Sequence, residues 1–345
     1  MKAIFTLFLT AVMLSASAQK IESWDSVAFY VGQNKLETPF EGGFNSPVFS
    51  AADVNEDGHK DLIVFERSDN SYYIYENAGI PNTVQYTYRP EWQSHFPKTE
   101  SFALSLDYNK DGVPDLITYS EVGAGMDIYR GSYNSGFIEF TRVVTRLRYI
   151  NGSNIYVDPT KLPAFGDVNG DGDIDIVTLG QFGQILDYYE NRAVEMGYSL
   201  DSLKFRYVTN CYGQVCSCHP TDPTIVLSGY NAAGCFYTPF APPPGQEGDG
   251  PEHLGGGALA LFDYNKDGHL DIVISEGSNR NLTLLMNTGV GPKDSLVQEQ
   301  VFFPQPNPVN LRVMPAPFLV DVNNDGKLDL IAAPYDVNNC VLYAS

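Results

Sequence analysis

One nine-residue pattern, D-x-N-x-D-G-x-x-D, occurs five times in this chain of 345 residues and constrains its fold more than any other feature. The copies begin at residues 53, 107, 167, 263 and 321, so three of the four intervals are 54 to 60 residues long and the other is 96. A repeat of this length, with several short strands per unit, is typical of propeller blades and not of a helical solenoid. The pattern therefore predicts five similar units.

Each copy carries oxygen-bearing side chains at positions 1, 3, 5 and 9 and a glycine at position 6. Calcium takes six to eight oxygen ligands, and glycine allows the sharp turn that brings such ligands together. The pattern therefore predicts one Ca²⁺ in each loop, about five in all. The predicted side-chain ligands are Asp53, Asn55, Asp57 and Asp61; Asp107, Asn109, Asp111 and Asp115; Asp167, Asn169, Asp171 and Asp175; Asp263, Asn265, Asp267 and Asp271; and Asp321, Asn323, Asp325 and Asp329.

The helix-loop-helix calcium site is the main alternative, because its loop shares the first half of this pattern. That site closes with a glutamate at position 12, whereas these copies carry Val64, Thr118, Thr178, Ile274 and Ala332 there. The residues that follow each loop are short, apolar and partly β-branched, as in buried strands. We therefore expect each loop to join two strands of a hairpin, with the aspartate at position 9 replacing the glutamate.

Further strands can be placed around each loop. A short apolar segment precedes every copy, a second follows it, and a third contains the residue fourteen positions after the closing aspartate. Those third-strand residues are Tyr75, Tyr129, Tyr189, Leu285 and Tyr343. The constant offset indicates one strand register in every unit, and more polar fourth strands follow at 86–88, 137–143, 203–208 and 301–303. The sequence thus predicts an all-β fold, a β-propeller of four-stranded blades.

Five blades are visible, and the last one stops within or just after its third strand. Residues 27–31 could supply its fourth strand and close a five-bladed ring, since propellers have four to eight blades. Alternatively, the chain is a fragment, and further blades follow Ser345 in a larger ring. The unpaired Cys340 slightly favours this second alternative.

The net charge of the chain and its N-terminal residues limit which partners the protein can bind and where it is located. The formal net charge of −21 argues against a nucleic-acid partner, because nothing offsets the phosphate charge. Residues 1–18 are typical of a signal peptide, with Lys2, an apolar stretch at 3–14 and small residues at 16–18. This stretch is shorter than the roughly 20 residues that cross a bilayer. We expect an exported protein, secreted or at the cell surface, with a propeller at 19–345 and no transmembrane segment.

The long interval contains an insertion at about 210–257 that holds four of the five cysteines. The export signal favours disulfides among them, although a zinc site that includes His219 is an alternative. The candidate disulfide residues are Cys211, Cys216, Cys218 and Cys235. The insertion is the best candidate for a partner-binding element, and a decorated surface loop is the simpler interpretation.

The five loops, each set between apolar strands, resemble the FG-GAP or VCBS repeats of integrin-α-like β-propellers over most of residues 45–345. The Phe-Gly and Gly-Ala-Pro marks of integrin blades are reduced to Phe165-Gly166, so the resemblance is to the bacterial secreted type. It implies that a hairpin in each blade binds Ca²⁺, with the backbone carbonyl of position 7 as a further ligand. These carbonyls belong to His59, Val113, Asp173, His269 and Lys327.

Together these features predict a calcium-binding adhesion or ligand-binding module, whose partner is a protein or a glycan at the cell surface or in the extracellular matrix. A lectin-like protein and a polysaccharide lyase or hydrolase are the alternatives. No enzyme activity is predicted and no catalytic residue is assigned, because the paired aspartates belong to the loops and no catalytic motif is present. For glycan binding, Tyr230, Phe236 and Tyr237 of the insertion are the candidate platform.

Overall fold

The computed structural model describes residues 29–31, 34–36, 43–180, 185–216, 226–227, 257–276, 280–289, 296–311 and 314–335. The chain divides into two units, 1–42 and 43–345. In the first unit, β1 (Phe29–Val31) pairs with β2 (Asn34–Leu36) in an antiparallel hairpin. The predicted signal peptide, the third strand around Tyr343 and Cys340 lie outside the described residues. Whether residues 27–31 complete a blade stays a prediction.

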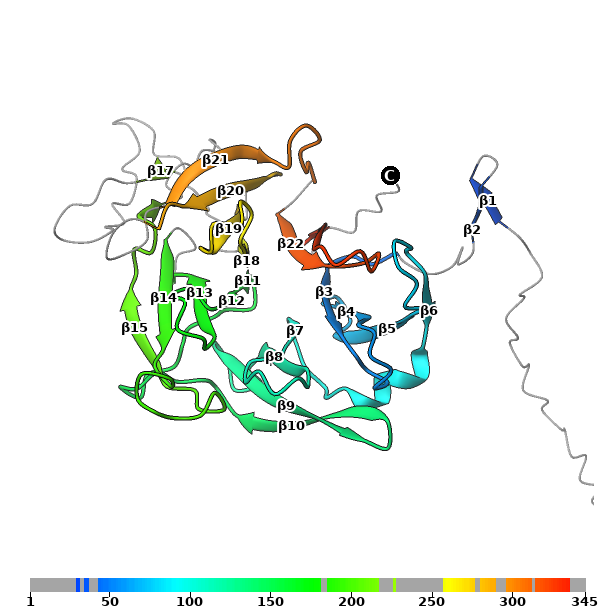
Figure 1. Cartoon of the computed structure of the whole chain (residues 1–345), viewed down its shortest axis with the longest axis horizontal. Helices are drawn as coiled ribbons and strands as arrows, with labels where there is room; N and C mark the ends of the chain where they lie inside the picture. Colours follow the sequence, from blue (N-terminus) through cyan, green and yellow to red (C-terminus); the bar gives the residue numbers. More distant parts are fainter. Residues whose placement is uncertain are drawn as a thin grey trace, which may run out of the picture. The chain divides into compact units, whose positions relative to one another are not determined.

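The second unit is a β-propeller with four complete antiparallel blades, which confirms the predicted fold class (Figure 1). We number the blades in chain order. Blade one contains β3 (Pro47–Ala52), β4 (Asp61–Glu66), β5 (Ser71–Asn77) and β6 (Tyr86–Tyr88); blade two contains β7 (Ala103–Leu106), β8 (Asp115–Tyr119), β9 (Met126–Asn134) and β10 (Phe137–Val144); blade three contains β12 (Ala164–Gly166), β13 (Asp175–Leu179), β14 (Leu186–Asn191) and β15 (Phe205–Thr209); blade four contains β18 (Gly257–Phe262), β19 (Asp271–Glu276), β20 (Leu282–Asn287) and β21 (Leu296–Phe303).

Few other elements are present among the described residues. The strand β11 (Lys161–Leu162) adds to blade four by pairing in parallel with β18, which the sequence did not predict. A short hairpin of β16 (Val215–Cys216) and β17 (Val226–Leu227) lies within the predicted insertion. The helix η1 (Pro90–His95) is a 3₁₀-helix that follows blade one. No helix among the described residues is long and apolar enough to cross a membrane.

The strand register repeats from blade to blade as the constant offset predicts. The residue directly after each closing aspartate pairs with the third-strand residue fourteen positions beyond that aspartate. The observed pairs are Leu62 with Tyr75, Leu116 with Tyr129, Ile176 with Tyr189, and Ile272 with Leu285. Equal register places equivalent side chains on the same face of every blade, so the apolar residues of neighbouring blades face one another.

A two-stranded hairpin lies between blade four and blade one. It consists of β22 (Pro315–Val320) and β23 (Asp329–Pro334), the first two strands of the predicted fifth blade. The strand β22 contacts both β18 and β3, so the two ends of the described propeller meet (Figure 1). The rings of Phe49 and Phe318 pack edge to face across this junction, with their centroids 5.6 Å apart. The described ring thus leaves no gap for another blade between β22 and β3.

Arg67, which follows β4, joins several units at this junction. Its Nε donates to the carbonyl of Ser101 at 2.6 Å, and its Nη1 donates to the carbonyl of Tyr335 at 2.5 Å and to Oγ of Ser46 at 3.2 Å. Its Nη2 donates to the carbonyl of Pro159. The guanidinium carbon also lies 3.7 Å from the centre of the Tyr335 ring. Since Arg67 is only 8% exposed, these bonds form in a buried site where they are strong.

Candidate functional site

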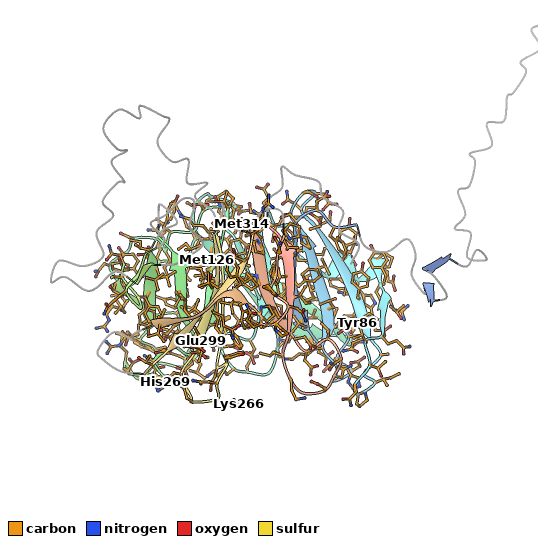
Figure 2. All side chains as sticks on the ribbon, turned by 90° about the horizontal axis from the view of Figure 1, so that it is seen from above. Tyr86, Met126, Lys266, His269, Glu299 and Met314 are labelled. Atoms are coloured by element: carbon orange, nitrogen blue, oxygen red, sulfur yellow. The ribbon has the colours of Figure 1, made fainter. Side chains whose placement is uncertain are left out.

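All five predicted loops join the first two strands of a unit, as expected from the sequence. We number them loop 1 (53–61), loop 2 (107–115), loop 3 (167–175), loop 4 (263–271) and loop 5 (321–329). In loop 4, Lys266 and His269 lie at the face of the propeller away from Met314, which precedes β22 (Figure 2). Position 6 needs glycine because its φ is positive in every loop, from 80° in loop 5 to 102° in loop 3.

The side chains at positions 1 and 3 accept the backbone N–H of position 5, and in loop 1 the carboxylate of position 5 accepts the side-chain amide of position 3. In loop 1, the amide of Asp57 donates to Oδ1 of Asp53 at 3.1 Å and to Oδ1 of Asn55 at 3.2 Å. The Gly58 amide donates to the other carboxylate oxygen of Asp53 at 2.8 Å. Loops 2, 4 and 5 repeat these bonds. The structure therefore brings together the three predicted oxygen ligands in the first half of each of these loops.

The aspartate at position 9 anchors the loop to its blade. In loop 1, Asp61 is fully buried, and its Oδ2 accepts the amide of Val54 at 3.0 Å. Its Oδ1 accepts the amide of Asn77 at 2.8 Å, sixteen residues along the chain. Loops 2, 3 and 4 make the same pair of bonds. Position 9 thus joins the hairpin loop to the end of the third strand.

The sequence did not lead us to the residues whose backbone N–H groups bond to this aspartate. They are Asn77, Gly131, Asn191 and Asn287, each two positions beyond the third-strand residue that the sequence did identify. The asparagine side chains also bond to the turn that follows, as Asn77 does with the amide of Gly79 at 3.0 Å. A side chain cannot fit at Gly131, because a Cβ there would lie 2.0 Å from the Pro114 carbonyl oxygen. The recurring asparagine was the signal in the sequence.

Burial makes the closing carboxylates hard to ionise. It raises the pKa of Asp61 and of Asp175 to about 7 and that of Asp115 to about 6. Backbone N–H donors lower these pKa values in part, and the other carboxylates of the same loop raise them further. The pKa of Asp271 is raised for the same reason. A bound divalent cation would remove this penalty by stabilising the charged form.

Loop 3 offers the clearest test of whether a cation fits. Oδ1 of Asp167, at position 1, is buried and has no hydrogen-bond partner, and neither has Oδ1 of Asp173. Carboxylate oxygens of Asp171, which belongs to loop 3, and of Glu190 and Glu195 lie within 4.8 Å of one another. Buried carboxylate oxygens without donors suit a hard, oxygen-seeking ion such as Ca²⁺.

Position 7 was predicted to contribute only its backbone carbonyl. The side chains of His59 and His269 pack over the glycines of a later turn, since a Cβ added to Gly79 or Gly289 would lie 2.5 or 2.4 Å from Nε2 of the histidine. The two imidazole rings therefore pack against the backbone of that later turn. In loop 3 the residue is Asp173, which is 1% exposed and accepts the amide of Val194 at 3.2 Å. Coordination by the position 7 carbonyls stays a prediction.

The loops also dock onto the next blade around the ring. Tyr133 of blade two donates its hydroxyl to the carbonyl of Asp53 at 2.8 Å, and the amide of Ile138 donates to the Val54 carbonyl at 3.0 Å. Loop 5 bonds to blade one in the same manner, through the amide of Thr83 and the Asn323 carbonyl at 2.8 Å. An ordered loop thus stabilises the interface between two blades as well as its own hairpin.

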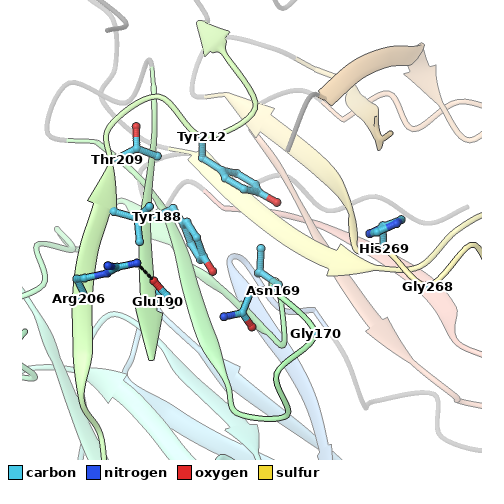
Figure 3. A pocket seen from close by; sticks show the side chains of 11 residues that line it. Asn169, Gly170, Tyr188, Glu190, Arg206, Thr209, Tyr212, Gly268 and His269 are labelled. Carbon is cyan, nitrogen blue, oxygen red and sulfur yellow. Dashed lines mark hydrogen bonds and ion pairs between the residues drawn. The ribbon is translucent and has the colours of Figure 1, made fainter. Parts of the chain in front are cut away.

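A cavity of about 400 Å³ lies between loop 3 and loop 4 (Figure 3). Side chains from blade three form one wall, loops 3 and 4 form the base, and the start of the predicted insertion contributes Tyr212. The lining residues are Val168, Asn169, Gly170, Tyr188, Glu190, Arg206, Val208, Thr209, Tyr212, Gly268 and His269. The sequence did not predict this cavity.

Most of the predicted insertion lies outside the described residues. Blade three ends at Thr209 and β18 begins at Gly257, and the insertion lies between them. Cys211 is buried next to Tyr212, whereas the side chains of Cys216, Cys218 and Cys235 are outside the described part. The disulfides, and the aromatic platform of Tyr230, Phe236 and Tyr237, therefore stay predictions.

An alanine substitution should separate the anchoring role of position 9 from metal binding. In saturating calcium, Asp61→Ala and Asp57→Ala each remove one predicted ligand of loop 1. Asp61→Ala also leaves two buried N–H groups without an acceptor, so we expect it to cost about 2–4 kcal/mol more stability than Asp57→Ala. Urea denaturation measures the difference. Equal losses would show that Asp61 does not anchor the loop.

Comparisons with known proteins agree with the repeat pattern. A family model described as an FG-GAP-like repeat matches residues 53–118 and 263–332. No curated protein matches the chain. The chain is similar to a solved lectin structure from Agrocybe aegerita, described as recognising non-reducing terminal N-acetylglucosamine, with 16% identity, a TM-score of 0.38, and coverage of 84% of this chain and 74% of that one. It is also similar to an Aleuria aurantia lectin variant in complex with Fucα1-6GlcNAc, with 9% identity, a TM-score of 0.36, and coverage of 84% and 80%.

Proposed function

Because this chain is a β-propeller that carries FG-GAP-like repeats, we propose that it is an exported, non-catalytic ligand-binding module whose blades are stabilised by calcium. The observation that supports this most strongly is the repeated loop geometry. The loops gather carboxylate and amide oxygens, and loops 1 and 5 do so at the junction of a hairpin with the next blade. In loop 3, two buried carboxylate oxygens have no donor.

Calcium would act here as a structural ion. It would supply positive charge between carboxylates that repel one another and would hold positions 1, 3, 5 and 9 of each loop in place. The loop residues themselves bind the backbone, orient the hairpin and dock onto the neighbouring blade. Since loops 1 and 5 bond to the next blade, calcium there would also make the contacts between blades more rigid, as a binding surface requires.

A direct measurement of stoichiometry tests the calcium part of the proposal. Equilibrium dialysis with metal analysis should find about five Ca²⁺ per chain at millimolar concentration, as for extracellular calcium modules with dissociation constants of about 10⁻⁴ to 10⁻³ M. A matched variant, Asp263→Ala with Asp267→Ala, should bind about one ion fewer, because it removes two ligands of loop 4. Finding no bound calcium would contradict the proposal.

The ligand is proposed to be a protein or a glycan at the cell surface or in the extracellular matrix. The cavity beside loop 3 is the specific feature that favours a small polar group over an extended protein surface. Binding of the purified propeller to a glycan array and to immobilised matrix proteins, each with calcium and with EGTA, separates these two partners. An absence of binding to both would contradict the ligand-binding role.

A further inference from the structure

We propose that the cavity between blades three and four binds one residue of a neutral saccharide, and that calcium in loop 3 orders this site. The inference rests on the proposed calcium-binding function and assigns a ligand class to one place in the propeller. The shape, the side-chain chemistry and the charge of the cavity each support it.

Two tyrosines give the cavity an apolar wall. The rings of Tyr188 and Tyr212 lie 5.2 Å apart, inclined at 45°, and both side chains are more than nine-tenths buried (Figure 3). Their packing fixes their orientation before any ligand arrives. Because so little of either ring is exposed, the two tyrosines shape this wall and do not act as a stacking platform. A volume of about 400 Å³ also suits a ligand of one or two sugar rings.

The blade three wall that carries Tyr188 also carries hydrogen-bonding groups of both kinds, Glu190 on the same strand and Arg206 on its partner strand. The guanidinium of Arg206 donates to the carboxylate of Glu190, and the Arg206 side chain is still 51% exposed. A donor and an acceptor side by side can bind neighbouring hydroxyl groups of a ligand. The side-chain amide of Asn169 and the hydroxyl of Thr209 also line the cavity. Because the Arg206 and Glu190 charges cancel, a neutral polyhydroxylated ligand fits better than an anion.

Residues of loop 3 also line the cavity. Asn169 and Gly170, at positions 3 and 4 of the loop, form part of the lining. The hydroxyl of Tyr188 donates to Oδ2 of Asp175, the closing aspartate, at 3.0 Å. An ion that fixes the loop would therefore also fix one wall and one ring of the cavity. By linkage, the saccharide should in turn strengthen calcium binding.

Blade one provides a matched control, because it has the same ion pair in a different setting. Arg89 donates to Glu76, which directly precedes Asn77 just as Glu190 directly precedes Asn191. Beside loop 1, Tyr133 and Ile138 of blade two bond to the loop itself, and the cavity of about 400 Å³ that touches loop 1 is lined by residues other than Glu76 and Arg89. Arg89→Ala and Arg206→Ala thus each remove the arginine of a Glu–Arg pair, but only Arg206 lines the cavity beside loop 3.

The test is a titration of the full chain with methyl glycosides of glucose, mannose, galactose, fucose and N-acetylglucosamine, followed by saturation-transfer NMR and calorimetry. In calcium, we expect at least one glycoside to bind, Arg206→Ala to weaken it at least tenfold, and Arg89→Ala to change it less than twofold. EGTA should abolish binding. Melting curves of both variants confirm that they fold.

Several outcomes would overturn the inference. These are an absence of binding by all five glycosides, equal losses in the two variants, or binding of glycine and short peptides at the cavity in preference to sugars. Calcium stoichiometry is measured separately. If about five ions bind but no glycoside does, the cavity assignment is wrong and the calcium proposal stands; if no calcium binds, the proposed function itself fails.

Discussion

Removing calcium with EGTA is expected to lower the melting temperature of this propeller by about 10 °C or more. For a dissociation constant of about 10⁻⁴ to 10⁻³ M, a few millimolar calcium stabilises the fold by roughly 1–2 kcal/mol at each site. Five loops that act together would contribute about 5–10 kcal/mol, which is comparable with the whole stability of a typical domain. Removing the ions also restores repulsion among carboxylates that the fold holds close together.

Differential scanning calorimetry in calcium, in EGTA and in EGTA with excess magnesium would measure this effect. Magnesium is the matched control, because it requires a nearly ideal octahedral site and keeps several of its waters. It should restore much less stability than calcium does. An identical melting curve in calcium and in EGTA would contradict a structural role for the ion.

The second large effect is expected at Arg67. Arg67→Ala should reduce the free energy of unfolding by about 3–5 kcal/mol, because it removes a buried guanidinium that bonds to carbonyl groups of three other segments, one of them fully buried. Those carbonyls belong to Ser101, Pro159 and Tyr335. Arg67→Lys should recover only part of the loss, since an ammonium group cannot reproduce the planar fork of a guanidinium.

Urea denaturation in saturating calcium measures the loss, with Arg148→Ala as the control. Arg148 is exposed, and its guanidinium donates to the carbonyl of Gly152, four residues away. We expect this control to change stability by less than about 1 kcal/mol. If Arg67→Ala were no more harmful than Arg148→Ala, Arg67 would not hold the ends of the ring together.

The parts of the fold that depend on local spacing could be predicted from the sequence. The loop pattern and the fourteen-residue offset determine which residues pair within a blade, because a hairpin joins segments that are close along the chain. The pairing of Leu62 with Tyr75 and of Ile272 with Leu285 follows from that spacing alone. The first three predicted oxygen ligands of a loop are equally local, and hydrogen bonds within the loop hold them close together. That they bind an ion stays a prediction.

The remaining features arise between segments that are far apart in the sequence. Arg67 meets Pro159 and Tyr335 only because the blades curve into a ring, and no short pattern encodes that meeting. The cavity beside loop 3 likewise depends on how blade three faces loop 4. Asn77 and its equivalents were the exception, because their constant position was visible in the sequence and was not recognised as an anchor for the closing aspartate.

A newly synthesised chain cannot complete this ring until Tyr335 has left the ribosome, because its carbonyl bonds to Arg67 across 268 residues of sequence. Topologies dominated by such distant pairings fold slowly, since the entropy of a very long loop is lost before any contact compensates for it. The nascent polypeptide should therefore remain loosely organised until this last contact closes the ring.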